Sequence, residues 1–236
     1  MEVKFTDCKH WCNKLIFGGG WKIMLEININ PKQLYEGCIQ AALTHAIAVG
    51  MYPELNYEHS WDGINYCTND SQGCRATITF HDKYIIAVFQ AIDKVNWNAD
   101  ALDFFDGAPK EIIEIAEKET LQYVLDSVEG SVKPVVTAAF WGTWDKLNST
   151  QSFDSIVENG GHIIRSQLLS FNDAMDEWRD YYDLDSKQIS LIKKLFNAKL
   201  GSNNDSLILN DDEIKLLYGD VDECLVSLGE LNIFRA

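Results

Sequence analysis

The amino-acid sequence predicts an α+β fold, in which an antiparallel sheet, a meander of three or more strands, is packed by helices and followed by a mainly helical C-terminal part. Three observations predict it. Apolar and polar residues alternate along residues 64–91, which is the period of half-buried strands. After Pro31 and Pro109, apolar residues instead recur every three or four positions, as on a helix face. Beyond residue 145 this helical period continues between glycine and Asx turns.

The first predicted helix follows a short alternating strand that starts at Met24. Asn30 is the expected N-cap, and Pro31 suits the first helical position, where no amide hydrogen is needed. Apolar residues then recur on one face as far as Gly50. We therefore expect an amphipathic helix that ends there, with His45 near the edge of its apolar face as a core or boundary residue.

The next segment predicts three strands joined by turns. The stretch CRATITF alternates apolar and polar residues, and YIIAVFQA is apolar in the manner of a more buried strand. The turn-forming stretch NDSQG separates CRATITF from a strand INYC. This register places Cys67 opposite Cys74. We expect the two as reduced, buried neighbours and not as a metal or redox site.

The rest of the chain is expected to be mainly helical. A second helix is predicted from Pro109 to about Gly130, and the apolar run VVTAAFWGTW after it fits either a buried strand or a loop packed on the core. Three later helices are expected. The first is FNDAMDEWRDYY, the second is capped by Ser186, and the third is capped by Asn210 and stops at Gly219.

The predicted organisation has three parts. Residues 1–23 mix lysine, glycine and aromatic residues without a lasting period and are expected to be a loosely attached extension. Residues 24–145 form the α+β core, and residues 146–236 form an acidic helical part, either in the same domain or beside it. A chain of 236 residues is long enough to bury a core without disulfides.

Charge limits the classes of partner. The chain carries 20 Lys+Arg and 36 Asp+Glu, a net charge of −16, and residues 98–236 account for −14 of it. Nucleic acids and anionic membranes would repel such a chain. There is no signal-peptide pattern, and no apolar run approaches the roughly 18 residues of a membrane span. We therefore expect a cytoplasmic protein with reduced cysteines and no nucleic-acid or membrane partner.

The first functional hypothesis is a non-catalytic binding protein. No nucleotide loop, GxSxG elbow or HExxH motif occurs in the sequence, and the acidity lies in the C-terminal part. Such a protein would dock on a basic protein partner, as a bacterial toxin-neutralising or regulatory protein does. The expected contact residues lie on the helix FNDAMDEWRDYY and are Asp173, Asp176, Glu177 and Asp180.

The second hypothesis is a small hydrolase or ligand-binding domain with an aromatic pocket. In HSWDG, His59 and Asp62 stand three positions apart, and a histidine that shares a proton with a carboxylate is a base near neutral pH. The expected pocket residues are Trp61, Arg75, Trp141 and Trp144.

The sequence predicts no cofactor and no bound metal. CKHWC offers three soft ligands, whereas a closed structural zinc site needs four. The acidic stretches DYYDLDS and GDVDE lack the ligand spacing of an EF-hand. The oligomeric state is left open.

Overall fold

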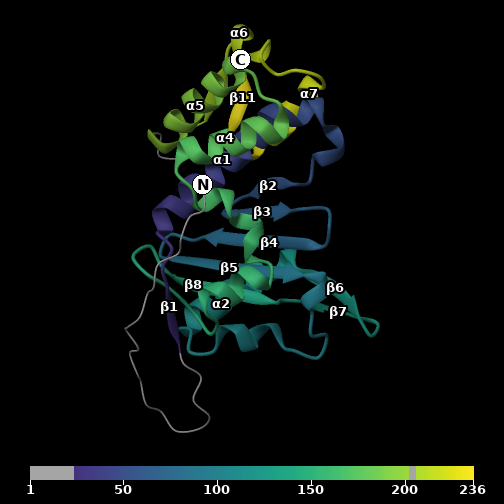
Figure 1. The fold of residues 1–236 in the computed structure, drawn as a ribbon, viewed down its shortest axis with the longest axis vertical. Helices are drawn as coiled ribbons and strands as arrows, with labels where there is room; N and C mark the ends of the chain where they lie inside the picture. Colours follow the sequence, from purple (N-terminus) through teal and green to yellow (C-terminus); the bar gives the residue numbers. More distant parts are fainter. Residues whose placement is uncertain (1–23, 202–205) are drawn as a thin grey trace.

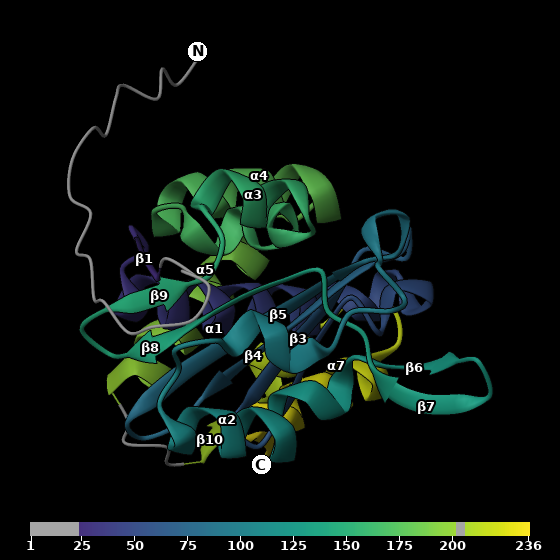
Figure 2. The same ribbon diagram turned by 90° about the horizontal axis from the view of Figure 1, so that it is seen from below.

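A seven-stranded antiparallel sheet forms the centre of the molecule, with helices on both faces (Figures 1 and 2). The computed structural model describes residues 24–201 and 206–236, so the predicted extension over residues 1–23 lies outside the described residues. The strand order is β1-β9-β8-β5-β4-β3-β2, and each neighbouring pair is antiparallel. The predicted α+β class, with helices in the C-terminal part, is confirmed.

The central strands are buried on both faces, which explains their continuous apolar sequences. The sheet consists of β1 (Leu25–Ile27), β2 (His59–Asp62), β3 (Asn65–Asn69), β4 (Cys74–Phe80), β5 (Tyr84–Ala91), β8 (Ala138–Thr143) and β9 (Leu147–Ser149). Two short pairs lie outside it: the hairpin β6 (Leu125–Val128) and β7 (Ser131–Pro134), and the parallel pair β10 (Leu207–Leu209) and β11 (Ile233–Arg235). The run VVTAAFWGTW therefore supplies β8, a central strand beside β5.

Helices cover the sheet unequally. The α-helices are α1 (Pro31–Ala48), α2 (Lys110–Lys118), α3 (Phe153–Glu158), α4 (Phe171–Tyr182), α5 (Ser186–Gly201), α6 (Asp211–Ile214) and α7 (Val221–Glu230). The 3₁₀ segments are η1 (Val49–Met51), η2 (Pro53–Leu55), η3 (Ile92–Lys94), η4 (Ala101–Phe105), η5 (Thr120–Tyr123), η6 (Gly161–Ile164) and η7 (Ser166–Leu168). The larger hydrophobic cluster joins one sheet face to α1, α4, α5 and α7, and the smaller joins the other face to α2, η4 and η5. No helix in the described residues is long and apolar enough to cross a bilayer.

Helix α1 begins where the sequence predicts. The Asn30 side chain accepts hydrogen bonds from the amides of Lys32 and Gln33 at 3.0 and 3.1 Å, with Pro31 as the first helical residue. The predicted amphipathic character is wrong, because every residue from Gly37 onward in the helix is buried. The cause is tertiary: α4, α5 and α7 pack on the helix as well as the sheet.

The second predicted helix is shorter than expected. Helix α2 ends at Lys118, and residues 125–134 form the β6–β7 hairpin instead of continuing to Gly130. Glu129 and Gly130 form its two-residue turn and both have positive φ, 51° and 82°. This is the backbone of the type I′ turn that matches strand twist. Gly130 was interpreted as a helix end, but it is a hairpin glycine.

The predicted pairing of two cysteines is wrong. Cys67 stands opposite Thr77 in the β3–β4 register, and its Sγ lies 3.6 Å from the Thr77 hydroxyl oxygen. On β4, Cys74 points to the same face as Ala76, whereas Thr77 points to the other face. Because successive side chains of a strand point to opposite faces, the two thiols lie on opposite sides of the sheet. Both are free and half-buried.

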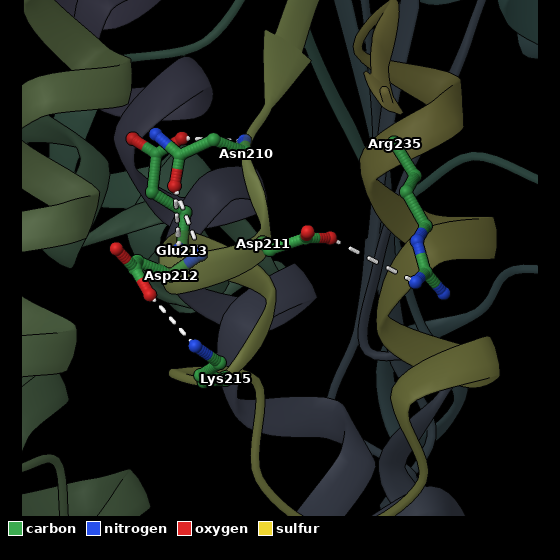
Figure 3. Close-up of polar contacts among 6 residues, drawn as sticks. All are labelled: Asn210, Asp211, Asp212, Glu213, Lys215 and Arg235. Carbon is green, nitrogen blue, oxygen red and sulfur yellow. Dashed lines mark hydrogen bonds and ion pairs between the residues drawn. The ribbon is translucent and has the colours of Figure 1, made fainter.

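The caps of the last helices match the prediction in part. Asp185, not Ser186, caps α5, because its carboxylate accepts hydrogen bonds from the amides two and three residues later, both at 2.8 Å. Asn210 caps α6 as expected and forms a capping box with Glu213 (Figure 3). This helix ends at Ile214, before the predicted end at Gly219.

The close approach of two backbone segments gives the first testable prediction. Gly219 has a φ of +73°, and a Cβ atom there would lie 2.0 Å from the carbonyl oxygen of Gly50. Gly107 also has a positive φ, +82°, but a Cβ atom there meets nothing within 4 Å. Gly107→Ala should therefore lower the free energy of unfolding by about 1–2 kcal/mol, the cost of a left-handed backbone conformation. Gly219→Ala adds overpacking, worth about 1–3 kcal/mol more.

Chemical denaturation of both variants and the wild type measures this difference. Equal losses in the two variants would show that the contact between Gly50 and Gly219 relaxes freely.

Candidate functional site

His59 and Asp62 are both on β2 but do not share a proton. His59 is 6% exposed on the face toward α1, and its Nδ1 lies 2.7 Å from the hydroxyl of Tyr66. Asp62 is exposed on the other face, where it accepts a hydrogen bond of 2.7 Å from the hydroxyl of Tyr123. A spacing of three brings side chains together on a helix, whereas on a strand it separates them.

Two of the predicted pocket residues, Trp61 and Trp144, pack into the core. Trp61 stacks on Phe80 with ring centroids 5.7 Å apart and an interplanar angle of 8°. The Trp144 ring lies 6.0 Å from the same phenylalanine, and Tyr35 of α1 contacts all three rings edge-on. Both indole N–H groups donate to backbone carbonyls at 3.0 Å. These aromatic side chains fill the space between α1 and the sheet.

The other two predicted pocket residues lie on the opposite face of the sheet. Trp141 is 2% exposed in the smaller hydrophobic cluster, beside α2. The Arg75 guanidinium donates to the carbonyl of Leu125 at 2.9 Å and lies 3.7 Å from the Asp126 carboxylate, both in β6. Arg75 and Asp126 line a shallow hollow of about 190 Å³. The predicted pocket residues are thus divided between two faces and do not converge in one cleft.

The predicted docking residues are on the outer face of α4. Asp173, Asp176 and Asp180 are exposed there, and Glu177 is half-buried. Each has a partner in the chain. Arg179 lies 3.3 Å from Asp176 and 3.2 Å from Asp180, Arg165 lies 2.9 Å from Glu177, and the Ser170 hydroxyl donates to Asp173 at 2.6 Å. Most of these groups face solvent, so the ion pairs contribute little to stability.

A buried polar cluster, which the sequence analysis missed, lies where α1, β2 and α4 meet. Its ionisable centre is a pair of histidines, His45 and His59, with ring centroids 5.4 Å apart. The cluster, which we name the buried histidine cluster, comprises His45, Glu58, His59, Tyr66, Gln167 and Tyr182, with the exposed Tyr181 at its rim. His45 and Tyr182 are 137 positions apart, so no local pattern brings them together.

Hydrogen bonds fix the hydroxyl groups of this cluster. The Gln167 amide donates to the Tyr66 hydroxyl oxygen at 2.7 Å, and Nδ1 of His59 lies 2.7 Å from the same hydroxyl. The hydroxyls of Tyr181 and Tyr182 donate to the two carboxylate oxygens of Glu58 at 2.7 and 3.1 Å. Nδ1 of His45 lies 3.2 Å from the Tyr182 hydroxyl.

Burial keeps both histidines neutral. It lowers the pKa of His45 to about 4, and a backbone hydrogen bond to Asn56 acts more weakly in the opposite direction. Burial also lowers the pKa of His59 well below its usual range, with His45 as a second cause. In the same cluster, burial and Glu58 raise the pKa of Tyr182 far above its ordinary value. The two histidines therefore act as structural groups whose protonation opposes folding.

The second prediction concerns acid stability. An unfolded chain protonates His45 near pH 6.5, whereas the folded chain does so only near pH 4. Stability from the neutral imidazole is therefore complete above pH 6.5 and is lost as the pH falls. The contribution of His45 alone to this loss is about 3 kcal/mol by pH 4. Denaturant titrations at several pH values should show a smaller loss for His45→Gln than for the wild type.

His81→Gln is the matched control, because this histidine is partly exposed in the β4–β5 turn and lies outside the buried histidine cluster. It should keep the wild-type pH dependence. Identical pH profiles for the wild type and His45→Gln would contradict the assignment.

Comparison with known proteins finds no family model, curated protein or solved structure that matches this chain. The fold defines an α+β protein with a buried pair of histidines, in which the predicted catalytic pair, His59 and Asp62, lies on opposite faces of β2.

Proposed function

We propose that this protein is a non-catalytic, cytosolic binding protein that docks on a basic protein partner, in the manner of a bacterial toxin-neutralising or regulatory protein. The observation that supports it most is the row of exposed carboxylates on α4. Asp173, Asp176 and Asp180 follow one another at three- and four-residue steps, so they lie on one side of the helix. Ala174, Met175 and Tyr182 occupy the buried side.

The exposed ion pairs of this row can be exchanged for contacts with a partner. The side chains of Asp176 and Asp180 are 69% and 77% exposed, and both share the single guanidinium of Arg179. Helix α4 carries four acidic side chains and this one basic side chain, so negative charge remains in excess. Long-range attraction to a basic surface would raise the association rate more than the affinity.

A second acidic group, at α6, is a weaker candidate because its carboxylates serve the fold. Glu213 completes the capping box, Asp212 lies 2.7 Å from Lys215, and Asp211 lies 3.9 Å from Arg235 (Figure 3). Glu213 also contacts Lys194. The hydrolase alternative has less support, since His59 is buried away from Asp62 and the tryptophans lie on two faces.

The third prediction tests docking through α4. Co-purification from the native cell identifies the partner, and stopped-flow mixing then measures association. The triple variant Asp173→Lys, Asp176→Lys, Asp180→Lys should slow association about tenfold or more at low salt, because it removes the steering field. Raising salt to shorten the screening length to about 8–10 Å should slow the wild type in the same direction.

A control variant with the same change in net charge distinguishes an effect of the docking site on α4 from an effect of total charge. Glu111, Glu114 and Glu117 are exposed on α2, which covers the opposite face of the sheet. Reversing these three to lysine changes the net charge by the same amount and should slow association much less. Equal effects of the two triple variants, or an association rate insensitive to salt, would contradict docking through α4.

A further inference from the structure

Three side chains with different metal-binding atoms meet at the end of the sheet where the turn joins β3 to β4. Asp70 lies in the β3–β4 turn, Cys74 is the first residue of β4, and His162 belongs to η6. One carboxylate oxygen, the thiol sulfur and one imidazole nitrogen all lie within 4.8 Å of one another. Ligands around a tetrahedral zinc ion, with bonds of about 2.0–2.3 Å, lie about 3.3–3.8 Å apart, so these side chains would close by up to about 1–1.5 Å on binding.

The turn holds Asp70 in place before any ion arrives. Its Oδ1 accepts hydrogen bonds from the amides of Gln72 and Cys74 at 2.8 and 2.9 Å. The turn is fastened to the end of β5, because the amide of Ile92 donates to the carbonyl of Gly73 at 2.9 Å. A Cβ atom at Gly73 would lie 2.4 Å from the Ile92 side chain, so this contact is as close as a glycine permits.

One ring nitrogen of His162 has a backbone partner, as is common for metal-binding histidines. Its Nδ1 lies 3.2 Å from the carbonyl oxygen of Val157. A hydrogen on Nδ1 donated to that oxygen leaves the lone pair on Nε2, and such partners commonly fix the tautomer of a metal ligand. The segment before η6 is anchored to the sheet, because the Thr137 hydroxyl donates to the carbonyl of Asn159 at 2.6 Å.

We propose that Asp70, Cys74 and His162 bind one zinc ion, or a transition-metal ion of similar preference. A thiolate with an imidazole and a carboxylate suits zinc, whereas calcium and magnesium prefer oxygen ligands alone. The carboxylate and thiolate together balance the charge of a divalent ion. Three protein ligands leave the fourth tetrahedral position for water or an external ligand.

This site differs from the cysteine pair considered in the sequence. Cys67 is on the opposite face of the sheet, and the third ligand is His162, far along the chain. The sequence predicted no metal here and placed Cys74 beside Cys67, so neither Asp70 nor His162 was expected next to it. The inference is independent of docking through α4, so either can fail alone.

The experiment uses the full, reduced chain and Co²⁺ as a spectroscopic probe for the zinc site. We expect binding of one equivalent, with a thiolate-to-cobalt charge-transfer band that Zn²⁺ removes by competition. Cys74→Ser should abolish the band, and His162→Ala should weaken Co²⁺ binding by about 10–100-fold. Asp70→Asn is the sharpest variant, because an amide oxygen can accept the same two backbone hydrogen bonds while the charge is lost. It should also bind Co²⁺ more weakly.

Control variants test whether another thiol produces the band and whether the loss of binding reflects a folding defect. Cys67→Ser and the double variant Cys8→Ser, Cys12→Ser should both keep the band. His162 is exposed, so His162→Ala should keep the wild-type melting temperature without metal. A band that persists in Cys74→Ser, a band lost in the double variant, or no thiolate band in the wild type would overturn the proposal.

Discussion

The burial of α1 on all sides from Gly37 onward is the constraint on which the rest of the structure depends. The sheet covers one side of the helix and the C-terminal helices cover the others. Two glycines, Gly37 of α1 and Gly50 of η1 directly after it, permit close backbone approaches by the covering segments. A Cβ atom at Gly37 would lie 2.0 Å from the carbonyl oxygen of Gln167, and one at Gly50 would lie 2.4 Å from that of Tyr218. Helix α1 and the C-terminal segments that cover it are therefore held together by close backbone contacts as well as by the packing of apolar side chains.

The same burial explains the histidine cluster. His45 is on α1 and His59 faces it from β2, so neither imidazole reaches solvent. Polar groups in such a place need partners, and Tyr182 supplies a hydroxyl from the inner side of α4. Helix α4 thus has two roles. The inner side of α4 supplies the Tyr182 hydroxyl to His45, and its outer side carries the acidic row that we propose for docking.

Local signals in the sequence predicted local structure well. Asn30 capped its helix as expected, and α4 occupies the predicted twelve residues. The errors arose where strand register or contacts between distant segments determine the structure. Cys67 stands opposite Thr77 because the turn after β3 sets the pairing, and the sequence does not state the turn geometry. The candidate sites were less predictable than the fold, because the partners of Cys74 and His45 come from distant segments.

The arrangement also connects the two sites that we propose, the acidic row of α4 and the metal site. His162 of the proposed metal site and Arg165 are three residues apart, and Arg165 lies 2.9 Å from Glu177 of α4. This short segment therefore touches both the β3–β4 turn and the acidic row. A basic partner that competes with Arg165 for Glu177 would act on the segment that positions His162. Because His45 and His59 are buried, a partner would reach the exposed carboxylates of α4 and the exposed His162 more readily than these two imidazoles.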